Sequence, residues 1–235
     1  MHVRAIVTVL NLVPALLGAQ QRTGDTRPGI AVLPFTNSGS FGQAKENFDA
    51  LERGIAGMMI SELARNPAAR VVERDQITQL LGEQNLGAQG RIDSATIVRV
   101  GKVTGARYMV MGTFIDFYGD FRIDVRLVNT ETSEIVKTES DRAQRDHLFD
   151  LIRNVSERLM KDANLPPLER GGGSRGSDQR SERKIPTEAL TYYSRALLYQ
   201  DRGETDKAVD MYTQALTIFP EYAEAQEGLQ RVKRS

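Results

Sequence analysis

The sequence predicts an α+β fold, a mixed sheet with an antiparallel meander and packed helices, followed by a small all-α helical hairpin. The clearest strand pattern is 121–127, where apolar residues alternate with Arg and Asp, as in a strand with one buried and one solvated face. Residues 109–115 are apolar on both faces, which favours a central strand. Together they predict a hairpin over 106–129 that turns at Tyr118-Gly119-Asp120, where Gly tolerates positive φ.

The first 19 residues carry the pattern of a secretory signal peptide. Arg4 supplies a basic start, residues 5–17 are mostly apolar, and Gly18-Ala19 provides small residues for cleavage. The alternative is an ordinary apolar strand or helix. No other segment is long and apolar enough to cross a bilayer as a helix. We therefore expect residues 1–19 to be removed and the mature chain to be exported, without a transmembrane segment.

One strand and one long helix are expected first in the mature chain. Residues 29–35 predict a strand, which Pro34 brings to an end because proline has no N–H for the ladder. Residues 36–47 are rich in Gly, Ser and Asn and predict a loop. A helix over 48–65 follows, because apolar side chains recur there at helical spacing: Leu51, Ile55, Met58, Met59 and Leu63.

A second strand and two further helices lead to the hairpin. Residues 70–73 predict the strand, and Asp75 is expected to cap the helix after it. Residues 85–92 predict a loop that contains glycine. Asp93 is expected to cap the next helix, which ends near Gly105.

After the hairpin, residues 134–139 predict a third adjacent strand. Asp146 is expected to cap a last helix, whose apolar side chains keep core spacing: Leu148, Leu151, Ile152, Val155 and Leu159. These elements complete an α+β domain over residues 29–163. Because the chain has no cysteine, this domain must depend on hydrophobic packing, not on disulfides.

Residues 165–186 predict a flexible linker. Leu165-Pro166-Pro167 stops the helix, and the Gly- and Ser-rich run 171–177 cannot bury enough apolar surface to fold. Its arginines are interspersed with Asp178 and Glu182, which argues against nucleic-acid binding. The chain has 31 basic and 31 acidic residues and no long block of one sign, so neither nucleic acid nor an anionic membrane surface is favoured as a partner.

Residues 187–235 resemble a tetratricopeptide repeat. With Pro220 as the closing proline, large, small and turn residues fall where the repeat has them: Tyr192, Ala196, Tyr199, Gly203, Ala208, Tyr212 and Ala215. Arg195 departs from the repeat, which usually has an apolar residue there. The candidate protein-binding residues are the five tyrosines, Tyr192, Tyr193, Tyr199, Tyr212 and Tyr222. The alternative is a plain helical hairpin with tyrosines in its core.

This unit amounts to one repeat and a following helix that starts near Glu221. About three repeats are usually needed for independent stability, because each repeat buries its apolar face against its neighbours. We therefore expect the unit at 187–235 to dock on the first domain, on another copy of itself, or on a partner.

No catalytic, cofactor or metal site is expected. His147 is the one histidine after the signal segment, and it is expected to face solvent in the first turn of a helix. The lack of cysteine excludes a His/Cys zinc cluster and a Cys-His nucleophile within one chain. No Walker-type phosphate loop is present.

Three carboxylates, Asp116, Asp120 and Asp124, gather around the hairpin turn. They could perform acid–base work or hold calcium. Turn formation and cross-strand pairing with Arg122 and Arg126 is the favoured interpretation. Glu73-Arg74-Asp75 is likewise interpreted as a strand end and a helix cap, so we expect a protein that is not an enzyme.

Several stretches, in order, resemble the curli production assembly/transport component CsgG family. They are Ile30-Ala31-Val32-Leu33-Pro34-Phe35, Val71-Val72-Glu73-Arg74 with Leu80-Leu81, Gly105-Ala106 before Val110-Met111-Gly112, and Val125-Arg126-Leu127-Val128-Asn129 before Thr132-Ser133-Glu134-Ile135-Val136. The resemblance covers residues 29–163.

The resemblance implies a bacterial, exported, periplasmic protein, in association with the outer membrane, whose domain can form homo-oligomeric rings. The best-known family member is a lipoprotein and a secretion channel for curli subunits. This chain lacks the lipoprotein cysteine, and its hairpin closes at 118–120 without the long membrane hairpins of that member. Ser133 also stands where the family often has glycine.

The first hypothesis is therefore a scaffold or accessory protein in cell-envelope export or assembly, in curli-type secretion among other systems, with a tetratricopeptide arm for protein binding. The second is a regulator of a periplasmic cell-wall enzyme, because outer-membrane activators of cell-wall synthases carry a similar small domain. The third is a ligand-binding or hydrolytic domain that uses the carboxylates near Asp120.

Overall fold

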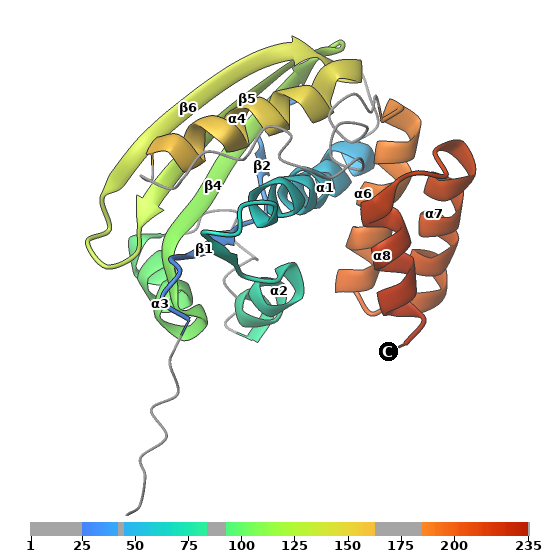
Figure 1. Cartoon of the computed structure of the whole chain (residues 1–235). Coiled ribbons are helices and arrows are strands. Elements are labelled where there is room, and N and C mark those ends of the chain that lie inside the picture. The colour runs from blue at the N-terminus through green and yellow to red at the C-terminus, as the bar shows by residue number, and fades with distance from the viewer. Residues whose placement is uncertain (1–24, 42–44, 84–92, 163–184, 235) are drawn as a thin grey trace, which may run out of the picture.

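A computed structural model of the chain describes residues 25–41, 45–83, 93–162 and 185–234 (Figure 1). The expected signal peptide, the expected loop at 85–92, and the linker apart from its last two residues lie outside these ranges. Within them, no helix combines the length and the apolar character needed to cross a membrane.

Six strands form one mixed sheet in the order β3-β1-β4-β5-β6, with β2 also paired to β4. Strands β1, β2 and β3 run parallel to their partners, and β4, β5 and β6 form the antiparallel meander. Their bounds are β1 Gly29–Val32, β2 Thr36–Asn37, β3 Arg70–Val71, β4 Ala106–Phe117, β5 Asp120–Asn129 and β6 Ile135–Gln144.

The central hairpin is confirmed. Phe117 pairs with Asp120, and the two residues between them have positive φ, 54° at Tyr118 and 98° at Gly119. Positive φ at both turn residues matches the right-handed twist of the strands, which suits a two-residue turn. The alternation on β5 is also confirmed, because Phe121, Ile123, Val125 and Leu127 are buried while Arg122 and Arg126 are exposed.

Four helices cover the sheet, two on each face. Helices α1 (Lys45–Ala64) and α4 (Leu148–Asp162) pack on the face that carries Val110, Phe114 and Ile123. Helices α2 (Arg74–Glu83) and α3 (Ser94–Thr104) pack on the other face, near β1 and β3. A 3₁₀ turn, η1 (Arg145–His147), leads from β6 into α4. We call the part from β1 to α4 the sheet unit.

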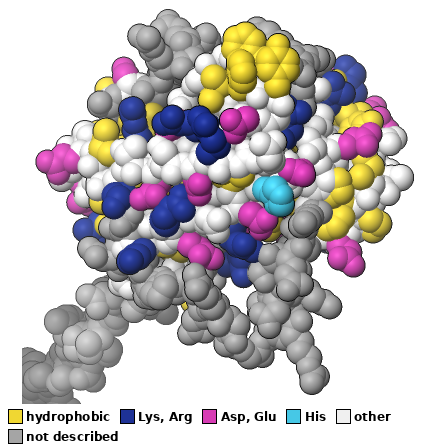
Figure 2. Space-filling view, turned by 90° about the horizontal axis from the view of Figure 1, so that it is seen from above, with side chains coloured by type: hydrophobic (Ala, Val, Ile, Leu, Met, Phe, Trp, Pro, Cys, Tyr) yellow, Lys and Arg dark blue, Asp and Glu magenta, His cyan; other side chains and the backbone are white. Residues whose placement is uncertain are grey.

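Among the described residues, helices cover the second face of the sheet only at one end. Its apolar cluster reaches Met109 on β4 and Val128 on β5, where α2 and α3 lie over it. Further along the strands Thr113, Arg122 and Arg126 are exposed. Figure 2, the view from above, shows basic and acidic side chains next to one another across this side of the molecule.

The helical unit consists of α6 (Thr187–Asp201), α7 (Thr205–Ile218) and α8 (Ala223–Val232). Figure 1 shows these helices as a bundle beside α1, with α6 against it. Apolar residues of the helical unit, α1, α4 and the sheet form one continuous buried cluster. The sequence predicts that this unit docks on the first domain, on another copy of itself, or on a partner. The structure shows it docked on the first domain, the sheet unit of the same chain.

The strand and helix bounds differ from the expected ones before the hairpin. The first strand ends at Val32 instead of residue 35, and residues 36–37, expected in a loop, form β2. The cause is local pairing, because Thr36 and Asn37 lie beside Thr113 and Phe114 of the long central strand. Helix α1 starts at Lys45, three residues before the expected start, and β3 has two residues instead of four.

One of the three expected helix caps is confirmed. The side chain of Asp93 accepts a hydrogen bond from the Thr96 amide, 2.8 Å, and Gly105 ends α3 with φ 64°. Asp75 is not a cap, because α2 already begins at Arg74 and places Asp75 in its first turn. Asp146 is not a cap either, because β6 continues to Gln144 through pairing with β5, and Asp146 then falls in η1.

We expect Gly112→Val to destabilise the sheet unit by about 1–3 kcal/mol, because a Cβ there would lie 2.4 Å from a ring carbon of Phe35 and 2.6 Å from the Asp124 carbonyl oxygen. Urea denaturation would measure the free energy of unfolding. Gly82→Ala in α2 is the control, since nothing lies within 4 Å of its Cβ, and it should stabilise by about 1 kcal/mol at most. Equal effects of the two changes would contradict this packing.

Candidate interaction site between the two units

The two units meet where α6 lies directly on two glycines of α1. A Cβ atom at Gly54 would lie 1.9 Å from Oγ of Ser194, and one at Gly57 would lie 2.7 Å from the hydroxyl oxygen of Tyr193. Ser194 is fully buried, and its hydroxyl donates to the Leu190 carbonyl at 2.8 Å. The helices can approach this closely because neither glycine has a side chain and because serine satisfies its hydroxyl within its own helix.

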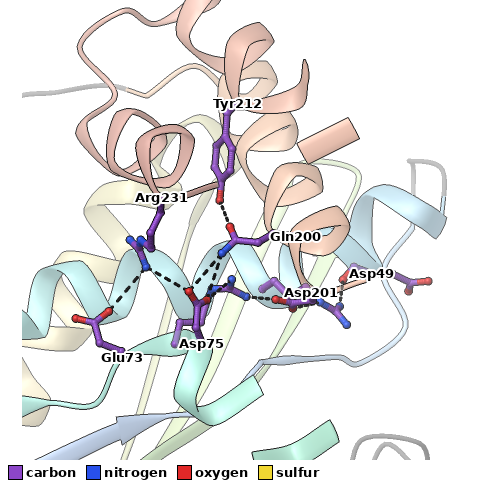
Figure 3. Close-up of polar contacts among 9 residues, drawn as sticks. Asp49, Glu73, Asp75, Gln200, Asp201, Tyr212 and Arg231 are labelled. Carbon is purple, nitrogen blue, oxygen red and sulfur yellow. Dashed lines mark hydrogen bonds and ion pairs between the residues drawn. The ribbon is translucent and has the colours of Figure 1, made fainter. Parts of the chain in front are cut away.

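A network of ion pairs closes one end of this interface, where α6 ends and α2 begins (Figure 3). Asp201 accepts from Nε of Arg53 at 3.0 Å and also pairs with Arg74, and Arg74 in turn donates to Asp75 at 2.7 Å. Burial would lower the pKa of Arg74, but the charge and hydrogen bond of Asp201 raise that pKa above its usual value. Arg74 therefore stays charged although the residue is only 9% exposed.

The network continues into the helical unit through Gln200. Its amide nitrogen donates to both carboxylate oxygens of Asp75, at 3.3 and 3.4 Å, and its amide oxygen accepts from the Tyr212 hydroxyl at 2.8 Å. Arg231 of α8 reaches the carboxylates of Asp75 and Glu73 at 3.7 and 3.8 Å. Figure 3 shows Gln200 between the ring of Tyr212 and the carboxylate of Asp75. Helices α6 and α8 thus contact α1 or α2 directly, and α7 joins the network through Gln200 of α6.

A cavity of about 440 Å³ opens beside this network, between α1, α6 and α8. Tyr193, Tyr212 and Gly228 contribute to its inner wall, where a Cβ at Gly228 would lie 2.5 Å from the Tyr212 ring. Its polar lining mixes both signs of charge: Glu62, Arg65, Glu73, Arg74, Glu224, Glu227 and Arg231. Such a lining can hydrogen-bond the backbone and polar side chains of a peptide.

The structure brings three of the five candidate tyrosines together in the core. Tyr193, Tyr212 and Tyr222 are at most 4% exposed, and the Tyr193 ring lies 4.9 Å from that of Tyr222 and 6.2 Å from that of Tyr212. Burial raises the pKa of the Tyr193 hydroxyl far above its usual range, and burial does the same for Tyr212. These rings stabilise the helical unit, and a binding role for them stays a prediction.

The other two tyrosines are partly exposed on α6. Tyr199 has the ammonium of Lys207 5.4 Å from its ring centre, a cation–π contact across α6 and α7. Tyr192 lines a shallow cleft with Thr187 and Arg195. Arg195, the departure from the repeat, is half-buried there.

The carboxylates of the hairpin have structural partners. Asp116 is fully buried, pairs with Arg145, and accepts from the Gly119 amide at 2.8 Å, as expected of a turn residue. Asp124 pairs with Arg122 at 2.7 Å.

The expected cross-strand pairing of these carboxylates with Arg122 and Arg126 is wrong. Arg122 and Asp124 lie on the same strand, where side chains two residues apart share a face. Across the strands, Asp120 pairs with Arg142 at 3.6 Å and Asp124 accepts from Ser140.

His147 lies in η1 with its side chain 47% exposed, beside Asp146 and Asp150. Among the described residues, no group of three or more His, Asp or Glu could hold a metal ion. No local pattern indicates that Glu73-Arg74-Asp75 joins two units, because Asp201 is 127 positions from Arg74.

Comparison with protein families gives two matches. Residues 15–122 match the curli production assembly/transport component CsgG, and residues 189–222 match the tetratricopeptide repeat. The expected combination of a CsgG-type unit followed by a tetratricopeptide repeat is therefore confirmed. The repeat indicates a role in protein–protein interaction. No curated protein matches the chain significantly.

Several solved structures are similar in part. The C-terminal domain of LpoB from Salmonella enterica has 16% identity and TM-score 0.35, over 52% of this chain and 87% of that one. TolB from Acinetobacter baumannii has 16% identity and TM-score 0.42, over 61% of this chain and 30% of TolB. A chain of the PelC dodecamer from Paraburkholderia phytofirmans has 11% identity and TM-score 0.34, over 60% of this chain and 90% of the PelC chain. All three scores lie below 0.5, so they add nothing to the assignment of function.

We expect Gly54→Ala to destabilise the protein by about 1–3 kcal/mol, because its Cβ would overlap Ser194 Oγ. Ser194→Gly in the same chain should restore part of the loss, since the nearest remaining atom, the Cα of residue 194, would lie 3.5 Å away. Urea denaturation of the four proteins gives the coupling energy, expected to be about 1 kcal/mol or more.

If α6 did not lie on Gly54, alanine at this helix position would instead stabilise the protein by up to about 1 kcal/mol, because alanine is the better helix former. A stabilising Gly54→Ala with no coupling to position 194 would therefore contradict the docked arrangement.

Proposed function

We propose that this protein is a non-enzymatic component of the bacterial cell envelope, a scaffold or accessory protein in export or assembly that binds protein partners with both units acting as one body. The observation that carries the proposal is the docking of the tetratricopeptide unit on α1 through Gly54, Gly57 and a shared apolar core. A single repeat is stable here because the sheet unit supplies the neighbour that further repeats would otherwise provide.

The docked arrangement restricts where a partner binds. Because α1 covers one face of α6, that face is occupied by the chain itself. A partner peptide would instead reach the cavity between α1, α6 and α8, whose lining on α8 includes Glu224, Glu227 and Arg231. Contacts there would involve both units at once, so binding would depend on their docking.

The non-enzymatic part of the proposal is supported by how the buried charges are used. Arg74 is held by Asp201 and Asp75, and buried Asp116 is held by Arg145 and the turn amide. Charged groups in such pairs have a structural role, because removing either partner leaves a buried charge uncompensated and destabilises the fold.

The location we propose is the periplasm, in association with the outer membrane, after removal of residues 1–19. The CsgG-type match over residues 15–122 supports an envelope protein. Curli-type secretion is the first system to test, and a homo-oligomeric ring built by the sheet unit is part of the same proposal.

The test is to express the full chain with a C-terminal tag in the bacterium that encodes it and to fractionate the cells. A photo-crosslinking residue in place of Glu227, on the wall of the cavity, should link the protein to a defined envelope partner. The N-terminus of the purified protein should lie close to residue 20.

The same crosslinker at Asp206, exposed on α7 and outside the cavity lining, serves as the matched control and should give far less product. An intact N-terminus in the cytoplasmic fraction, or products equal in amount and identity at the two positions, would contradict the proposal.

A further inference from the structure

The part of the sheet that no described helix covers presents a continuous surface that the function proposed above does not use. Side chains of β4, β5 and β6 that share this face lie opposite one another in register, Met111 with Arg126, Thr113 with Asp124 and Ile115 with Arg122. Arg122 in turn lies opposite Arg142 of β6. The rows end at Phe117, beside the turn. We call this surface the open face.

Three aromatic rings stand at the end of the open face. Phe41 is 53% exposed, Phe117 57% and Tyr118 73%, which are high values for large apolar side chains. The rings contact one another edge to face, with centres 5.8 Å apart for Phe41 and Phe117 and 5.2 Å for Phe117 and Tyr118. A clustered, exposed aromatic patch on a soluble unit marks an interaction site more often than a single exposed ring does.

The backbone holds these rings in place. Residues 37–41 are fixed by Asn37, whose side-chain oxygen accepts from the amides of Gly39 and Ser40 at 3.2 and 3.0 Å. The Asp116 amide donates to Oγ of Ser40 at 2.9 Å, which joins that segment to β4. Rings that are held before binding lose little freedom when a partner arrives, so they suit a contact surface.

Arginines accompany the rings along the open face. Arg122 and Arg142 are opposite each other although both are positive, an arrangement that costs stability. Asp124, whose pKa the hydrogen bond from Arg122 lowers, stays ionised beside them, and Asp120 pairs with Arg142. Arg126 is exposed and has no ion pair in the part of the chain that the structure describes.

The composition of this surface matches that of protein contact surfaces. Aromatic residues and arginine are enriched at protein–protein interfaces, whereas lysine and glutamate are depleted. The open face has three arginines and three aromatic rings, and its β5 and β6 positions carry no lysine or glutamate: Asp120, Arg122, Asp124, Arg126, Thr138, Ser140 and Arg142. An anionic bilayer surface would favour a larger excess of positive charge than three arginines beside two aspartates provide.

We propose that the open face binds a carboxylate-bearing segment of a protein partner. Apolar side chains of that segment would lie against Phe41, Phe117 and Tyr118, and its carboxylates would pair with Arg126 and Arg122. Charge complementarity selects this partner, because the guanidinium of Arg126 can bind a carboxylate through two parallel hydrogen bonds, and Arg122, which donates from Nε and Nη2 to Asp124, adds positive charge beside it. The inference rests on the proposed function, because it assigns one surface to a partner that the scaffold binds.

The experiment measures fluorescence anisotropy of a labelled twelve-residue peptide with glutamates around one phenylalanine and one leucine. The full mature chain should bind it, and added salt should weaken binding because the contact is between charges. The R122E/R126E variant should bind at least roughly tenfold more weakly, and should instead bind the matched peptide with lysine in place of glutamate. The F117S/Y118S variant should bind the glutamate peptide more weakly, because it lacks two of the three exposed rings.

The control is K102E/K233E, which makes the same change of charge at two exposed positions outside the open face and should leave binding unchanged. Equal melting temperatures would show that the variants fold. Peptide binding that is absent, or that K102E/K233E lowers as much as R122E/R126E does, would overturn the proposal.

Two further results would overturn it in favour of another occupant. Cosedimentation with phosphatidylglycerol vesicles that is lost in R122E/R126E, without peptide binding, would assign the open face to a membrane. A mass in light scattering that falls to one chain in F117S/Y118S would assign it to a second copy. If crosslinking at Glu227 finds an envelope partner while the peptide test fails, the proposed function stands and this assignment falls.

Discussion

The close contact of α1 with α6 is the constraint on which the rest of the structure depends. Gly54 and Gly57 leave room for Ser194 and Tyr193, so that two helix backbones meet where ordinary side chains would hold them apart. Tyr193, which lies against Gly57, also packs its ring against the rings of Tyr212 and Tyr222. The tetratricopeptide unit therefore has a buried core although it contains one repeat.

The charged network at the end of α6 serves a different purpose from the apolar contact. Taking Arg74 and Asp201 out of water costs free energy, which their pairing and hydrogen bonds offset only in part, so the network contributes little net stability. What it can supply is specificity, because only one position of α6 brings Asp201 between Arg53 and Arg74. The apolar contact thus holds the helical unit on the sheet unit, and the ion pairs fix its register.

Much of the fold could be predicted from local patterns. The hairpin follows from alternation along β5 and from Gly119 at the turn, and helix α3 follows from Asp93 and Gly105 at its ends. Such signals are contained within a few residues, so one sequence reveals them. The bounds of β2 and β6 could not be predicted in this way, because pairing with the long central strands determines where they begin and end.

Most residues of the candidate site could not be recognised as a site from the sequence. Gly54 and Gly57 look like ordinary glycines inside an apolar helix pattern, and only α6, far along the chain, explains them. Asp75 resembled a helix cap, but its partners Gln200 and Arg231 lie more than a hundred positions away.

The measurement that tests the docked arrangement most directly is native-state hydrogen exchange of the full chain with increasing denaturant. We predict that amides of α1 and α6 exchange through one common opening, with the same free energy and the same dependence on denaturant. Exchange of α6, α7 and α8 through a separate opening of lower free energy, while α1 stays protected, would contradict it.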